Sequence, residues 1–186
     1  ARAPGVEALD GTAEALPLPD HSVDAAVAAQ AFHWFDAPVA LAELHRVLRP
    51  GGALALVWNV RDESVDWVRR FGELLVAAAA DDPASAEFQA TGKPYEEGTD
   101  WVGVIAAAGG FTPVRREVLP WAQPIDPDLL VRRAVSTSFV SALPDDARAD
   151  ALDRIRDLAA THPDLAGRAS FGFPHETVVY WCHSTD

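Results

Sequence analysis

The chain lacks methionine entirely, including at position 1, and it contains a single cysteine, Cys182. One thiol cannot form an intrachain disulfide, so a disulfide-stapled fold is excluded and a reducing, cytoplasmic compartment is predicted. Because Cys182 follows the apolar run Val178–Trp181, we expect a half-buried strand thiol and not a nucleophile. Without an initiator methionine, we expect the native start to lie outside this chain.

Basic residues are also scarce. There are 15 Lys and Arg against 28 Asp and Glu, which gives a net charge of −13. Nucleic-acid binding depends on cations that neutralise phosphates, so this balance argues against a nucleic-acid partner and favours a small-molecule ligand. No apolar run reaches the length that spans a bilayer, and the longest apolar stretch is Leu74–Ala80. No membrane partner is therefore expected.

Several chemical signatures are missing as well. The chain has no glycine-rich phosphate or dinucleotide loop, no nucleophile elbow and no Cys–His arrangement for nucleophilic catalysis. His33 and His45 have no neighbours at metal-ligand spacing, so no metal site is predicted. His45 is expected on a helix surface, while His162 and His175 suggest no site.

What is present is an alternation of apolar strands and amphipathic helices. Strands are predicted at Val6–Leu9, Val23–Ala29, Ala53–Trp58, Phe111–Gln123 and Phe171–Cys182. Helices are predicted to begin at Asp36, Ser64, Asp100, Asp126 and Pro144, the first of them ending at Pro50-Gly51-Gly52.

This order predicts one α/β domain over residues 1–186, with a doubly wound, mostly parallel sheet and helices on both faces. Asp81–Gly98 reads as a loop, and the small apolar residues of Val23–Ala29 predict a strand that is covered on both faces. Trp67, Trp101 and Trp121 are expected in the core.

Four segments carry a family resemblance through their order and spacing. They are GTAEALPLPD at Gly11–Asp20, SVD at Ser22–Asp24, QAFHWF at Gln30–Phe35 and ELHRVLRPGG at Glu43–Gly52. Together they resemble the class I S-adenosylmethionine-dependent methyltransferases, in particular the small-molecule branch called type 11. The resemblance implies a Rossmann-like sheet whose last strand is antiparallel. It also implies a domain truncated at its N-terminus, since the strands that carry the family's glycine-rich motif are missing here.

The resemblance also implies site residues and a cofactor, S-adenosyl-L-methionine. Thr12, Ala13 and Glu14 match the loop that borders the adenine. Gln30, Phe32 and Trp34 match the segment after the next strand, at the ligand-binding edge of α/β sheets, where a ring face near a sulfonium gains from cation–π attraction.

Methyl transfer requires few catalytic side chains, because the positively charged sulfur of S-adenosylmethionine already provides the leaving group. No sharp catalytic motif is therefore expected in the sequence. His33 is the candidate general base, since imidazole titrates near working pH, and an orienting or packing role is the alternative. Asn59 and Arg61 follow a strand and are candidates for the substrate mouth, with a solvated loop as the alternative. The resemblance places the acceptor pocket in the variable segments Asp62–Tyr95 and Pro124–Leu143.

Two alternatives to a catalytic methyltransferase remain open. One is a ligand-binding module without catalysis, and the other is a fragment that binds no cofactor by itself. In the last case the Val23–Ala29 strand has an open edge, and self-association into a homodimer is expected, since unpaired strand edges recruit partners.

Overall fold

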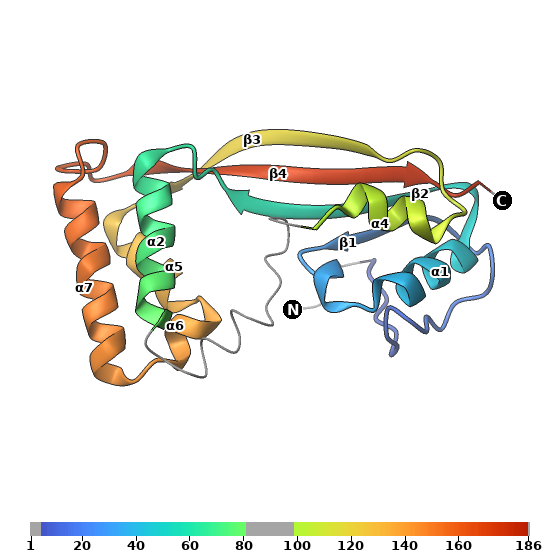
Figure 1. Ribbon diagram of the computed structural model, residues 1–186, viewed down its shortest axis with the longest axis horizontal. Helices are drawn as coiled ribbons and strands as arrows, with labels where there is room; N and C mark the ends of the chain where they lie inside the picture. Colours follow the sequence, from blue (N-terminus) through green and yellow to red (C-terminus); the bar gives the residue numbers. More distant parts are fainter. Residues whose placement is uncertain (1–4, 81–98, 186) are drawn as a thin grey trace. The chain divides into compact units, whose positions relative to one another are not determined.

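The computed structural model describes residues 5–80 and 99–185 and has an α/β architecture. Its four-stranded sheet has the order β1-β2-β4-β3 (Figure 1). The strands are β1 (Val23–Ala29), β2 (Leu48–Arg61), β3 (Arg115–Ile125) and β4 (Phe171–His183). All but the first strand predicted from the sequence are therefore found.

The sheet is mixed, which corrects the expectation of a mostly parallel one. Within the described part of the sheet, the parallel pair is that of β1 and β2. At the start of β2, Gly51 N–H donates to Ser184 O at the end of β4, and beyond the end of β2, Asp62 N–H donates to Pro174 O near the start of β4. These contacts make β4 antiparallel to β2, so the predicted antiparallel C-terminal strand is confirmed.

The chain divides into two compact units. Unit 1 comprises Ala1–Trp58, Tyr95–Val118 and Val178–Asp186, and unit 2 comprises Asn59–Pro94 and Leu119–Thr177. Each unit contains one end of the strands β2, β3 and β4. That the chain functions as a single domain stays a prediction.

Unit 1 holds β1, the 3₁₀ turn η1 (Phe32–Trp34), and the helices α1 (Ala37–Val47) and α4 (Trp101–Ala108). Both helices begin where the sequence predicts, because an aspartate caps each N-terminus. Asp36 accepts the backbone N–H of Val39, and Asp100 accepts that of Gly103.

Helix α1 ends at Val47, before the Pro50-Gly51-Gly52 that was expected to stop it. The last carbonyls of the helix, at Arg46 and Val47, accept the backbone N–H groups of His21 and Ser22 on the approach to β1. Leu48 then pairs with Val23, so β2 has already begun. The helix therefore ends where a strand satisfies its carbonyls, and the register between β1 and β2 shifts just after that pair.

Unit 2 is built on the helices α2 (Asp66–Ala80), α5 (Pro127–Val135), α6 (Ser138–Ala142) and α7 (Asp145–Thr161). Figure 1 shows α2 beside α7. The apolar stripe predicted for α2 is confirmed: Trp67, Phe71 and Leu75 are buried in one cluster with residues of α5, α7 and β4. Helix α2 begins two residues after the expected Ser64, and α6 was not predicted.

Several local expectations are wrong. Val6–Leu9 forms no strand, and Val6 and Leu9 are 68% and 53% exposed, since no strand in the described part pairs with them. Strand β1 has no fully buried residue, because it pairs only with β2 and lies at the edge of the sheet. Trp121 is 42% exposed and not in the core. The expected loop Asp81–Gly98 lies outside the described residues.

Within the described residues, no helix combines the length and the apolar character needed to cross a bilayer.

Candidate cofactor site

The candidate site in unit 1 begins at the carboxyl end of β1. Gln30 directly follows the strand and has a φ of 53°, in the left-handed region that few residues other than glycine adopt. Its backbone N–H donates to Val57 O on β2 at 2.9 Å, which holds the chain in this turn. A strained residue held by its neighbours at a strand end is a typical feature of binding sites.

The turn η1 then presents three aromatic side chains with different exposures. Phe32 is fully buried and packs edge-on against Trp101 with ring centroids 5.6 Å apart. Trp34 is 65% exposed, and its ring lies 4.9 Å from that of His33. Phe32 therefore anchors the turn in the core, and Trp34 presents an apolar surface at the rim.

The Thr12–Ala15 segment is a tight turn that lies next to η1. Ala15 N–H donates to Thr12 O at 3.2 Å, and Ala13 occupies the middle of the turn. Gly11 precedes it because a Cβ there would lie 2.7 Å from the ring of Pro17. The decisive contact is made by Glu14, whose Oε1 accepts the backbone N–H of Asp36 at 3.0 Å.

That hydrogen bond also lowers the pKa of Glu14 below its ordinary value. It keeps the carboxylate ionised and joins the turn to the residue that follows η1. The structure thus brings together the candidate residues Thr12, Ala13, Glu14, Gln30, Phe32 and Trp34 in unit 1.

Two residues of α1 hold the segment between this turn and β1. Glu43 accepts the backbone N–H of Leu16 at 2.7 Å and both Nε and Nη2 of Arg46. Arg46 in turn donates to the carbonyls of Leu16 and Leu18 and to the carboxylate of Asp20. The Glu-x-x-Arg pair of the ELHRVLRPGG segment is therefore a structural clamp, a role that its sequence spacing did not reveal.

His33 has a neighbour that bears on its chemistry. The indole Nε1–H of Trp58, which can only donate, points to Nδ1 of His33 at 3.3 Å. The lone pair at Nδ1 is thus engaged, and the proton of the neutral ring is assigned to Nε2. Burial lowers the pKa of His33, which favours this neutral form. The arrangement suits an orienting role better than proton abstraction.

Trp58 is also the centre of an aromatic wall in unit 1. Its ring stacks on Trp101 at 5.2 Å and meets Tyr180 edge-on at 6.0 Å. Since Trp58 is fully buried, this wall fixes the indole N–H that holds His33.

The two candidates for the substrate mouth belong to unit 2. Asn59 Oδ1 accepts the hydroxyl of Thr177 at 2.6 Å, and Arg61 Nη2 lies 3.2 Å from Glu63 Oε1. Both residues are on the last part of β2. Their role at a substrate mouth stays a prediction.

Other histidines depart from the sequence expectation. His45 is half-buried and packs edge-on against Phe111, with its Nε2 buried and without a hydrogen-bond partner. His162 and His175 are buried, and each has specific partners. Cys182 lies on β4 as expected but is fully buried and not half-buried, and burial raises its pKa to about 11. Among the described residues, no group of three or more His, Cys, Asp or Glu could hold a metal ion.

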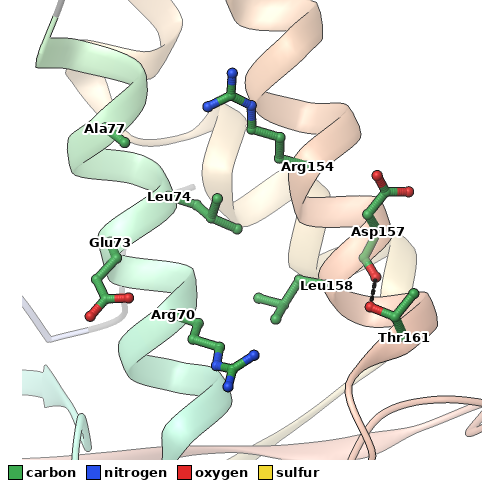
Figure 2. Close-up of a pocket in the computed structure, with 8 residues that line it drawn as sticks. All are labelled: Arg70, Glu73, Leu74, Ala77, Arg154, Asp157, Leu158 and Thr161. Carbon is green, nitrogen blue, oxygen red and sulfur yellow. Dashed lines mark hydrogen bonds between the residues drawn. The ribbon is translucent and has the colours of Figure 1, made fainter.

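Unit 2 has a shallow hollow of about 370 Å³ between α2 and α7. Figure 2 shows the eight residues that line it: Arg70, Glu73, Leu74, Ala77, Arg154, Asp157, Leu158 and Thr161. Arg70 is paired with Asp66 at 2.8 Å and Glu73 with Arg69 at 2.5 Å, so both charges already have partners. Leu74 and Leu158 face each other across it (Figure 2). This lining shows no convergent polar groups, which a ligand site requires.

Comparison with known proteins agrees with the fold. Residues 1–56 match the family described as methyltransferase domain, type 11. The chain is 39% identical over 175 residues to an uncharacterized methyltransferase of Mycobacterium tuberculosis, covering 94% of this chain and 64% of that protein. It is 29% identical over 177 residues to an uncharacterized methyltransferase-like protein of Schizosaccharomyces pombe, again covering 64% of it.

A solved structure from Anaeromyxobacter dehalogenans, assigned to the type II methyltransferases, has the same fold. Its TM-score is 0.66 at 24% sequence identity, and the alignment covers all of this chain and 74% of that one. The family model and these relatives support a class I S-adenosylmethionine-dependent methyltransferase. It spans just under two thirds of the length of these curated relatives.

Proposed function

We propose that the protein transfers a methyl group from S-adenosylmethionine to a small-molecule acceptor. The observation that carries this proposal is the 3.0 Å hydrogen bond between Asp36 N–H and Glu14. It keeps the turn at residues 12–15 beside the aromatic turn at residues 32–34, and these are the two segments that the family resemblance assigns to the cofactor. The match of residues 1–56 to the methyltransferase domain supports the same function.

The residues present fit the adenosine end of this cofactor. The backbone of Thr12 and Ala13 and the Thr12 hydroxyl offer hydrogen-bonding groups for the edge of a base. Gln30 lies at the rim, Phe32 anchors the aromatic turn in the core, and the exposed ring of Trp34 offers a face to a cation. When bound, the cofactor supplies a methyl group on a positively charged sulfur. The protein's contribution is then mainly orientation, which can be worth roughly 7–11 kcal/mol.

His33 serves this mechanism as a positioning residue. Because its Nδ1 accepts from Trp58, its ring is fixed in one tautomer beside Trp34. Asn59 and Arg61 are assigned to the acceptor side. We expect the protein to act in the cytoplasm on a soluble acceptor, without a nucleic-acid or membrane partner.

Calorimetric titration with S-adenosylhomocysteine tests the proposal. It should be run on this chain and on the product of its complete gene, because the chain spans only 64% of its relatives. Trp34→Ala should weaken binding by about tenfold, given a stacking contribution of about 1–2 kcal/mol, and Trp34→Phe should retain most of it.

Absence of binding to the complete gene product would overturn the proposal. Binding only to the complete product would favour the alternative, in which this chain alone is a non-binding module that self-associates. The exposed edge strand β1 is the observation that keeps this alternative in view.

A further inference from the structure

In unit 2, cationic and polar side chains from three strands and one helix lie close together. Arg61 comes from β2, Gln123 from β3, Arg133 from α5 and His175 from β4; we call these four residues the arginine cluster. None of the four is fully exposed, and His175 is 4% exposed.

Arg133 is held by neutral partners. Its Nη1 donates to Gln123 Oε1 at 2.5 Å, its Nη2 lies 3.1 Å from His175 Nε2, and its Cζ lies 4.8 Å from the centre of the Phe173 ring. Within the described residues, no carboxylate lies within ion-pair distance of it. A guanidinium has five N–H donors, and the contacts above use two of them.

His175 cannot compensate this charge. Its Nδ1 lies 2.8 Å from the carbonyl oxygen of Phe173, which only accepts, so the ring proton is assigned to Nδ1. Nε2 then presents its lone pair to Arg133. Burial, Arg133 and Arg61 together lower the pKa of His175, and they favour this neutral form despite the opposing hydrogen bond to Phe173. The stacked ring of Trp121, 4.7 Å away, covers the imidazole.

Arg61 adds a second cation. Its Nε is buried and has no hydrogen-bond partner, and its only carboxylate contact among the described residues is the 3.2 Å pair with Glu63. Burial is the main cause that lowers the pKa of Arg133, and the charge of Arg61 is the second. The positive charges of these two partly buried arginines thus repel each other.

This arrangement is costly without an anion. Burying a charge lowers stability unless it is paired and hydrogen-bonded, and a donor left without an acceptor adds to the cost. The chain has 28 Asp and Glu residues for 15 Lys and Arg, yet among the described residues Arg133 has no ion-pair partner and Arg61 has only the pair with Glu63. An oxyanion between the two guanidinium groups would satisfy the free N–H donors and remove the repulsion.

We propose that the arginine cluster binds an oxyanion, a carboxylate or a phosphate, on the small-molecule acceptor. The identity of the ligand as an acceptor rests on the proposed methyltransferase function. The cluster includes Arg61, which was already a candidate for the substrate mouth, and it adds three residues that sequence analysis did not single out.

The test is calorimetric titration of the chain with citrate and, separately, with inorganic phosphate. Arg133→Gln should weaken binding by about tenfold or more, because a hydrogen bond to a charged group contributes roughly 1.5–3 kcal/mol. Arg132→Gln is the matched control: it removes the same charge from the same helix, but Arg132 is 64% exposed and lies 3.9 Å from Asp126. We expect its effect to stay within about twofold.

Arg61→Gln provides a second variant if Arg133→Gln does not fold, and it should also weaken binding. Tighter binding of citrate than of phosphate identifies a carboxylate as the source, and the reverse order identifies a phosphate ester. Equal losses in Arg133→Gln and Arg132→Gln, or no binding of either anion to the wild type, would overturn the proposal. Titration of the same samples with S-adenosylhomocysteine separates its failure from that of the proposed function.

Discussion

The clamp formed by Glu43 and Arg46 explains how a loop without regular structure keeps its shape beside the candidate site. Leu16–Asp20 contains two prolines and forms no helix or strand. Its backbone groups at Leu16 and Leu18 are hydrogen-bonded by these two side chains. Hydrogen bonds from Arg46 and from Leu16 N–H lower the pKa of Glu43 to about 2.

This shift has a direct consequence for acid stability. A carboxyl group whose pKa falls from 4.5 to about 2 on folding stabilises the folded state above pH 4.5. The stabilisation is lost progressively as the pH falls from 4.5 towards 2. We therefore expect Glu43→Gln to lower the melting temperature at neutral pH, with the difference from wild type shrinking across that window. Thermal unfolding monitored by circular dichroism at a series of pH values measures this.

Glu73→Gln is the appropriate control, because Glu73 is exposed and pairs with Arg69, one turn away on its own helix α2. It should change the melting temperature little at any pH. A Glu43→Gln difference that stays constant down to pH 2 would show that the lost stability comes from packing and not from ionisation.

Some residues of the candidate site could be predicted from the sequence, and others could not. Thr12, Glu14 and Trp34 lie in contiguous segments whose residue order carries the family resemblance. Arg133 and His175 are 42 positions apart and meet only through the tertiary fold. No periodicity or local spacing marks such a pair, so sequence analysis treated His175 as a scattered histidine.

At the scale of elements, starts were easier to predict than ends. The starts of α1, α4 and α5 depend on one local interaction, the aspartate cap at Asp36, Asp100 or Asp126. The end of α1 depends on a strand twenty-five residues earlier in the chain, because His21 and Ser22 take its last carbonyls. Likewise, the exposure of β1 depends on how many strands pair with it, and the amino-acid composition of the strand does not reveal that number.

The turn after α4 allows two effects of glycine to be separated. Gly109 and Gly110 have φ values of 71° and 75°, which strain any other residue. A Cβ at Gly109 would meet nothing within 4 Å, whereas one at Gly110 would lie 2.6 Å from the ring of His45. Gly109→Ala should thus cost about 1–2 kcal/mol from backbone strain alone. Gly110→Ala should cost about 1–3 kcal/mol more, because the half-buried His45 ring must move.

Urea unfolding of the two variants gives both free energies directly. Equal destabilisation by the two substitutions would mean that His45 moves away at little cost. In that case, its edge-on contact with Phe111 would not be a rigid part of unit 1.

At the scale of the whole chain, the parallel pair β1–β2 ends at β1 in the described sheet. Val27 on this strand is 66% exposed, and the backbone on the outer side of β1 has no partner strand within the described residues. An open, apolar strand edge is a template for pairing with another chain. We therefore expect this chain to self-associate through β1, with an apparent mass in sedimentation velocity that rises with concentration.

Val27→Lys should reduce that association, because a charge on an edge strand opposes edge-to-edge pairing. Val76→Lys is the matched control: Val76 is 53% exposed, but it lies on α2, away from any strand edge. Its association should match that of the wild type. A monomer at every concentration would contradict the prediction, and equal loss in both variants would trace the association to general apolar contact. Association that only Val27→Lys weakens would assign it to the edge of β1, which is the strand that leads into Gln30 and the aromatic turn.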